Sequence, residues 1–163
     1  MTAVHPVARF VPGFVGTPGQ RTFYFEVEAV PGRAVWYVAE KTQVAAFAAE
    51  SLVLLAELGF IGAGAHLDVT PMRTPETEGF RIGELGLEYV EADRVVLVRL
   101  APVNKPAEGD VHAVTPAQLD AAARIAVTAV EAGRPSCRRC GLAMDPEGHI
   151  CPTTNGDLRG HRP

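Results

Sequence analysis

Four residues near the C-terminal end of this sequence have the types and the spacing of metal ligands: Cys137, Cys140, His149 and Cys151. The chain has three cysteines, and all of them belong to this set. A Cys-x-x-Cys turn presents two sulfur atoms to the same point, and Gly141 lets the backbone turn away without a Cβ clash. His-x-Cys, between a glycine and a proline, forms a second turn. Because Zn²⁺ usually takes four Cys or His ligands in a tetrahedron, the set predicts a zinc site.

The number of ligands predicts the role of the metal. Four protein ligands leave no open position for water or substrate, so the zinc is expected to be structural and not catalytic. Other chemistries are less favoured. A redox Cys-x-x-Cys normally opens a helix, whereas this pair follows one. A structural disulfide is unusual in a chain without an export signal, and an iron–sulfur cluster needs His149 as an unusual ligand. The spacing does not distinguish zinc from iron in the cell.

Basic residues gather in the same C-terminal segment. Residues 134–163 carry five arginines against three acidic residues, so this segment is +2 and the rest of the chain is −6. Arg138 and Arg139 lie between the first two cysteines and are predicted to contact a partner, with a solvated segment as the alternative. A protein partner is favoured over nucleic acid, because nucleic-acid-binding domains are normally basic and this chain has a net charge of −4. The oligomeric state is not predicted.

The first half of the chain has the pattern of a β-hairpin followed by a helix. Apolar residues alternate with polar ones over residues 21–28, as in a half-buried strand. A Pro-Gly turn follows, and residues 34–38 resume strand-like composition. From Thr42 to Leu58 the apolar residues have helical spacing, and Gly59 is placed for a C-terminal cap.

The second half has the same hairpin-then-helix order, without a convincing sequence repeat. Glycines and prolines in residues 60–79 predict a long loop with a short strand at 66–69. A hairpin of residues 80–89 and 95–100 follows. A bulge is predicted near Gly83, because the alternation of apolar and polar residues shifts by one position between Ile82 and Leu85. Residues 111–114 predict a short strand. Thr115 and Gln118 then form a capping box for a helix that ends at Gly133.

These elements predict an α+β fold: an antiparallel sheet built from two hairpins, with two helices on one face. The α+β domain is placed at residues 1–133 and the zinc-binding tail at residues 134–163. Roughly 18–20 consecutive apolar residues would be needed to span a membrane, and the sequence has no such run. The first residues lack the pattern of a signal peptide. A cytoplasmic location is therefore expected.

The C-terminal motif is similar to that of a known family. Residues 137–156, Cys-x-x-Cys-Gly-Leu-x-Met-Asp-Pro-Glu-Gly-His-Ile-Cys-Pro-x-x-Asn-Gly, resemble the ending of an uncharacterised, mainly actinobacterial family catalogued as domain of unknown function 3090. The resemblance extends to residues 9–23, 40–44, 80–83 and 119–135. The family often has proline at the position of Arg138 and a basic residue at that of Thr153, but no departure removes a proposed ligand. The resemblance implies no established activity.

Two functions are compatible with these patterns. The first is a non-enzymatic binding or adaptor protein that uses the zinc-held arginine segment. The second is an enzyme that acts on a phosphorylated or acidic small molecule, with a pocket in the α+β body that uses Arg21, Arg81 and a histidine or carboxylate from residues 60–79. No catalytic residue is identifiable, since catalytic groups are defined by geometry.

Two further groups of residues are less informative. Arg21 follows glycines at positions 13, 16 and 19 and is a candidate anion contact, although turns that lead into a strand explain those glycines better. The remaining histidines have no motif around them and are expected at the surface or in turns: His5, His66, His112 and His161.

Overall fold

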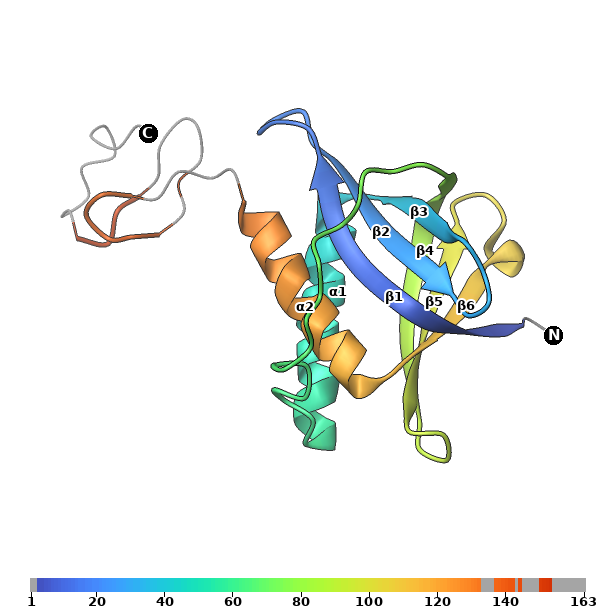
Figure 1. The fold of residues 1–163 in the computed structure, drawn as a ribbon. Helices are drawn as coiled ribbons and strands as arrows, with labels where there is room; N and C mark the ends of the chain where they lie inside the picture. The colour runs from blue at the N-terminus through green and yellow to red at the C-terminus, as the bar shows by residue number, and fades with distance from the viewer. Residues whose placement is uncertain (1–2, 133–136, 143, 145–149, 154–163) are drawn as a thin grey trace. The chain divides into compact units, whose positions relative to one another are not determined.

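The computed structural model describes residues 3–132, 137–142, 144 and 150–153. Within these residues the chain forms six strands, two α-helices and one short 3-10 helix (Figure 1). The elements are β1 (Val4–Val15), β2 (Thr22–Ala29), β3 (Ala34–Ala39), α1 (Lys41–Leu58), β4 (Glu78–Val90), β5 (Val95–Pro102), η1 (Pro106–Glu108), β6 (Asp110–Val114) and α2 (Pro116–Glu131). The chain divides into two compact units, residues 1–16 with 21–130 and residues 17–20 with 131–163.

The strands of the first unit close into a barrel in sequence order. Neighbouring strands are antiparallel except for two parallel pairs, β3 with β4 and β6 with β1. The α+β class and both predicted hairpins, β2–β3 and β4–β5, are therefore present, but the prediction of a purely antiparallel sheet is wrong. One of the parallel pairs involves β1, which was not predicted because Pro6, Pro12 and Gly13 interrupt its apolar pattern. The first residues of β1 pair with β6 and the rest pairs with β2. The other parallel pair, β3 with β4, joins the two predicted hairpins to each other.

The two halves of the barrel unit have the same topology, three strands followed by a helix. Each first strand carries a bulge, between Val7 and Arg9 in β1 and between Ile82 and Glu84 in β4. The side-chain amide of Gln43 donates to the Ile82 carbonyl at 2.9 Å, and that of Gln118 donates to the Val7 carbonyl at 3.1 Å. Gln118 follows Gln43 by the same number of residues as Ile82 follows Val7, so the two hydrogen bonds occupy equivalent positions in the two halves. The chain thus contains a structural repeat that its sequence does not display.

The helices begin and end where local signals place them. Thr115 and Gln118 form the predicted capping box of α2, with reciprocal bonds of 2.9 and 3.1 Å. Glu40 and Gln43 form an equivalent box at the start of α1, which was not predicted. Gly59 adopts the left-handed conformation, with φ of 76°, and caps α1 as predicted. The bulge near Gly83 is also confirmed.

One apolar core joins the barrel to both helices, which lie on the same side of it (Figure 1). Phe25 from β2 packs edge-on against Phe47 from α1, with ring centroids 5.1 Å apart. Leu119 and Ala122 from α2 belong to the same cluster. Burial of this shared apolar face stabilises the unit, since helices of this length gain most of their stability from packing.

Residues 60–77, which we call the strap, connect α1 to β4 and cross the outer surface of β1 (Figure 1). The predicted long loop is confirmed, but residues 66–69 form no strand. The fully buried Glu26 accepts hydrogen bonds from Arg9 of β1 at 2.8 Å and from Arg73 of the strap at 2.5 Å. At the other end, the Gly64 N–H donates to the buried Asp120 of α2 at 2.8 Å. Buried carboxylates therefore hold both ends of the strap.

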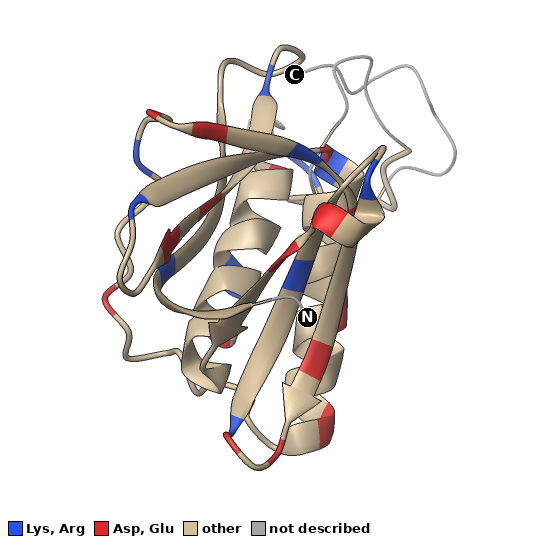
Figure 2. Cartoon of the chain, turned by 90° about the vertical axis from the view of Figure 1, so that its right-hand side faces the viewer, with Lys and Arg blue, Asp and Glu red and all other residues tan. Residues whose placement is uncertain are grey.

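Charged residues of both signs are interspersed over the strands and loops of the barrel unit (Figure 2). Neither of the two described helices is long and apolar enough to cross a membrane.

Candidate metal centre

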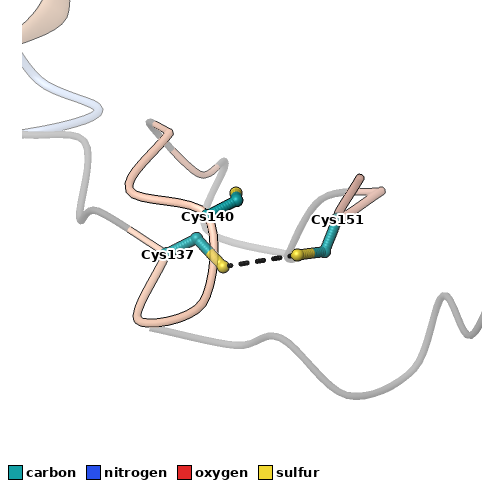
Figure 3. A group of neighbouring side chains, drawn as sticks. All are labelled: Cys137, Cys140 and Cys151. Atoms are coloured by element: carbon teal, nitrogen blue, oxygen red, sulfur yellow. Dashed lines mark hydrogen bonds between the residues drawn. The ribbon is translucent and has the colours of Figure 1, made fainter. Parts of the chain in front are cut away.

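The three cysteines meet at one point in the second unit (Figure 3). Their sulfur atoms all lie within 4.8 Å of one another, and the Sγ atoms of Cys137 and Cys151 are 3.8 Å apart. Two sulfurs bound at 2.3 Å to one tetrahedral zinc lie about 3.8 Å apart. A disulfide needs about 2.05 Å, and none of the three cysteines is in a disulfide. The observed spacing therefore fits a shared metal and not a covalent bond.

A tight turn brings the first two sulfurs together, as the Cys-x-x-Cys spacing predicts. The Gly141 N–H donates to the Cys137 carbonyl, and the Cys137 N–H donates to the Leu142 carbonyl, both at 2.8 Å. Gly141 has a φ of +74°, in the left-handed region that side chains with a Cβ avoid. Glycine is required there for its backbone conformation and not for lack of space, since a Cβ at this position would meet no atom within 4 Å.

Backbone N–H groups point at the sulfur atoms and stabilise their anionic form. The amides of Cys140 and Arg139 donate to the Cys137 sulfur and lower the pKa of this thiol to about 7, against the effect of burial. The Thr153 side chain, whose hydroxyl oxygen is 3.0 Å from the Cys151 sulfur, lowers the pKa of that thiol. Burial raises the pKa of Cys140, although the Leu142 amide opposes this. Thiolates are the metal-binding form, so two of the three cysteines are prepared for binding.

An apolar shell surrounds the sulfurs. Cys137, Met144 and Cys151 are each no more than 3% exposed and form a small cluster, with Cys140 packed against it. Among the described residues, this cluster contains a single side chain other than the cysteines, and so small an apolar cluster cannot by itself hold a folded segment together in water. A bound ion is a physical source of the missing stability, since metal binding by such segments is coupled to their folding.

The other predicted residues of this unit divide into two groups. His149 lies outside the described residues, so its role as the fourth ligand stays a prediction. Arg138 and Arg139 are exposed on the turn between the first two cysteines. Two large apolar side chains of the same unit are also exposed, Leu142 at 54% and Ile150 at 72%.

The two arginines proposed for anion binding in the barrel unit already have protein contacts. Arg21 donates to the Ala129 carbonyl of α2 at 3.1 Å, and its guanidinium lies over the Phe14 and Phe23 rings. Arg81 bonds to the Glu40 carboxylate at 2.5 Å. Arg81 also lines an open hollow of about 440 Å³ together with Phe80, Pro102, Val103, Asn104 and Lys105.

One histidine differs from its prediction. His5 and His66 are exposed, as expected, whereas His112 is only 4% exposed. Its burial follows from the closure of the barrel, because β6 lies between β5 and the unpredicted β1. Alternation along β6 could have indicated an inward-facing side chain at position 112, since Asp110, His112 and Val114 share one face.

The fold and the cysteine cluster together define an α+β barrel protein with a candidate thiolate metal centre. Comparison with known families narrows this class. A family described as "Protein of unknown function (DUF3090)" matches residues 3–151, and the chain belongs to this family. The match includes all four predicted ligands. Neither the curated proteins nor the solved structures include a match to this chain.

Proposed function

We propose that Cys137, Cys140 and Cys151 bind one structural Zn²⁺ together with His149, and that the ion orders the C-terminal unit as a binding module. The observation that carries this proposal is the 3.8 Å separation of the Cys137 and Cys151 sulfurs, the edge length of a zinc–thiolate tetrahedron. Thiolates and imidazole are ligands that zinc prefers, and a completed set of four leaves no position for a substrate.

Metal content tests the first part of the proposal. Tag-free protein, purified without added metal, is expected to contain about one zinc per chain by elemental analysis. Cys140→Ser and His149→Ala are each expected to reduce the zinc content sharply, whereas His66→Ala, which changes an exposed histidine of the other unit, keeps it. A metal-free wild-type protein contradicts the proposal, and about one equivalent of iron in place of zinc corrects the identity of the ion.

The binding role rests on what the cysteine turn exposes. Arg138 and Arg139 project from a turn that the metal fixes on both sides, close in sequence to the exposed Leu142. Charged and apolar groups held on a rigid turn lose little conformational entropy on association, so they suit a partner with an acidic surface and an apolar contact. We therefore propose a non-enzymatic binding or adaptor protein with a protein partner.

A charge-reversal variant tests this role. Arg138→Glu/Arg139→Glu is expected to lose partners that the wild-type protein retains in affinity capture from its native cells, while the zinc content stays unchanged. Arg94→Glu, at an exposed turn of the barrel unit, is the matched control. If nuclease treatment releases the partners that the wild-type protein retains, the partner is a nucleic acid and not a protein. Identical association by wild type and double variant ends the proposal.

A second candidate function is an enzyme that acts on a phosphorylated or acidic small molecule. It is favoured by the hollow of about 440 Å³ that Arg81, Asn104 and Lys105 line, because two cations and an amide can bind an anionic group that takes the place of their carboxylate partners, Glu40 and Glu108. Calorimetric titration with inorganic phosphate and with pyrophosphate tests it. Binding by the wild type that Arg81→Ala weakens supports an anion site, and the absence of binding to either probe removes the support.

A further inference from the structure

A second group of metal-ligating side chains lies where β1 meets β6. His5 and His112 stand directly opposite each other in the parallel pairing of these strands, and their ring centroids are 6.3 Å apart. Asp110 precedes His112 by two residues in the same strand, so both side chains point to one face. From β3, the Tyr37 hydroxyl donates to Asp110 Oδ2 at 2.7 Å. Three strands thus bring two imidazoles and an oriented carboxylate together.

His112 has polar atoms that nothing in the described part of the chain satisfies. Its side chain is 4% exposed, and neither ring nitrogen has a hydrogen-bond partner there. An imidazole without such partners loses its hydration on folding and gains nothing in exchange, and a bound water or ion is one of the causes of such a group in native proteins.

The equivalent position in the first half shows that packing alone does not require imidazoles. Tyr37 corresponds to His112, because the pair Phe23–Ala39 corresponds to the pair Val96–Val114 at the ends of β3 and β6. Tyr37 packs against Phe80 with centroids 4.9 Å apart, as His112 faces His5. Phenyl and phenol rings fill this place in one half, so the ring nitrogens in the other half need a separate reason.

We infer that His5, His112 and Asp110 form a binding site for one divalent transition-metal ion. Two imidazoles and a carboxylate are a ligand set that such ions favour. Tyr37 occupies one carboxylate oxygen of Asp110 and orients the other, which is the second-shell support typical of metal ligands. Three protein ligands leave a coordination position open on the side of the exposed His5. Unlike the cysteine centre, this site has room for a water or a small ligand on the ion.

Binding requires a small movement of one ring. With metal–nitrogen distances of about 2.0–2.1 Å, the centroids of two imidazoles on one tetrahedral ion lie roughly 5 Å apart. The observed distance between the His5 and His112 centroids, 6.3 Å, is longer than this. The ligand atoms of His5, His112 and Asp110 do not all lie within 4.8 Å of one another, as the cysteine sulfurs do. His5 is exposed, so rotation about its side-chain torsions can bring its ring closer to His112 and Asp110 without moving the core.

Titration with Ni²⁺ tests the site. The full-length, tag-free chain is first loaded with Zn²⁺ to fill the cysteine centre, and Ni²⁺ binding is then measured by calorimetry near neutral pH. The wild-type protein is expected to bind about one Ni²⁺, and His5→Ala and Asp110→Asn are expected to weaken binding at least tenfold. His112→Phe, which reproduces the ring packing of Tyr37 on Phe80, is expected to abolish it. His66→Ala, another exposed histidine, is the matched control and binds as the wild type does.

A spectroscopic measurement separates this site from other metal-binding surfaces. Cu²⁺ bound in place of Ni²⁺ is expected to show coupling to two imidazole nitrogens in electron paramagnetic resonance, and this signature is lost in His5→Ala. If His112→Phe does not fold, the His5 and Asp110 variants decide, because their side chains lie at exposed and half-buried positions. Absence of Ni²⁺ binding by the zinc-loaded wild type overturns the inference. So does a Ni²⁺ affinity equal to that of the wild type in both His5→Ala and Asp110→Asn.

Discussion

The side-chain amide of Gln118 donates a hydrogen bond to the backbone carbonyl of Val7, 3.1 Å away, and ties the start of α2 to the bulge in β1. The same side chain accepts the Thr115 N–H in the capping box. Gln118→Ala removes both contacts and leaves a carbonyl without its partner. We expect the free energy of unfolding to fall by about 1–2 kcal/mol in urea titrations. Gln20→Ala, at an exposed turn, is the control, and an equal loss in both variants contradicts this role.

Removal of the metal is expected to unfold the C-terminal unit and leave the barrel unit intact. In the described part of the chain, the cysteine cluster has little apolar core of its own, whereas the barrel has an extensive one. In amide NMR spectra after chelation, signals of residues 137–142 should collapse to unfolded positions, and barrel signals should keep theirs. Re-addition of Zn²⁺ should restore the spectrum. Loss of the barrel signals on chelation contradicts this independence.

Glu26 should be far more important for stability than its neighbour Glu28. Glu26 is fully buried between Arg9 and Arg73, whereas the pair of Glu28 with Arg73 is largely exposed. Glu26→Gln removes the buried counterion of Arg9, whose side chain is 15% exposed, and the first of the two carboxylates that pair with Arg73, so we expect a loss of about 2–3 kcal/mol. Glu28→Gln should cost less than about 1 kcal/mol. Urea unfolding measures both, and similar small losses contradict the proposed role of Glu26 in holding the strap.

The Glu26 carboxylate should also cause part of the loss of protein stability at acidic pH. Burial alone raises the pKa of Glu26, but hydrogen bonds from Arg9 and Arg73 outweigh it, so the pKa lies below its ordinary value of 4.5. Because the folded-state pKa is lowered, Glu26 stabilises the fold above this ordinary value, and the contribution is lost as the pH falls through the lowered pKa. The free energy of unfolding should therefore decrease less between pH 6 and pH 3 in Glu26→Gln than in the wild type. Parallel profiles contradict this assignment.

Gly64 should not tolerate a side chain. A Cβ at this position would lie 2.4 Å from the Ala117 carbonyl oxygen and 2.7 Å from the Ala121 nitrogen, both backbone atoms of α2. Gly64→Ala must therefore move the strap away from the helix and weaken its bond to Asp120, at an expected cost of about 1–3 kcal/mol. Gly86→Ala is the matched control, since the nearest atom lies 4.0 Å away. Thermal unfolding compares the two, and a neutral Gly64→Ala contradicts the close approach.

The predictable parts of this protein depend on residues close together in the sequence. The helical spacing of apolar residues in α1 and the Thr115–Gln118 box of α2 are local patterns, and the turn from Cys137 to Cys140 follows from the Cys-x-x-Cys spacing and one glycine. The two hairpins were found for the same reason. These signals need no knowledge of the tertiary structure.

The unpredicted parts depend on contacts between distant segments. Pro6 and Pro12 interrupt the alternating pattern that would have predicted β1. The place of this strand in the barrel depends on pairing with β6, more than a hundred residues later in the sequence. The burial of His112 follows from that pairing and was missed with it. Strap contacts such as Arg73 with Glu26 join an irregular segment to a strand, and no periodicity signals them. The role of His149 stays a prediction.

The parallel pairing of β1 with β6 has a consequence for synthesis on the ribosome. Val4 pairs with Val111, so the barrel cannot close until nearly the whole of its unit has been translated. Until then, the emerging first half exposes strand edges at β1 and at β3 that only the second half can cover. Such long-range closure slows folding, and these open edges are sites where two nascent chains can pair with each other. Chaperones that shield strand edges should therefore matter most for this protein before β6 emerges.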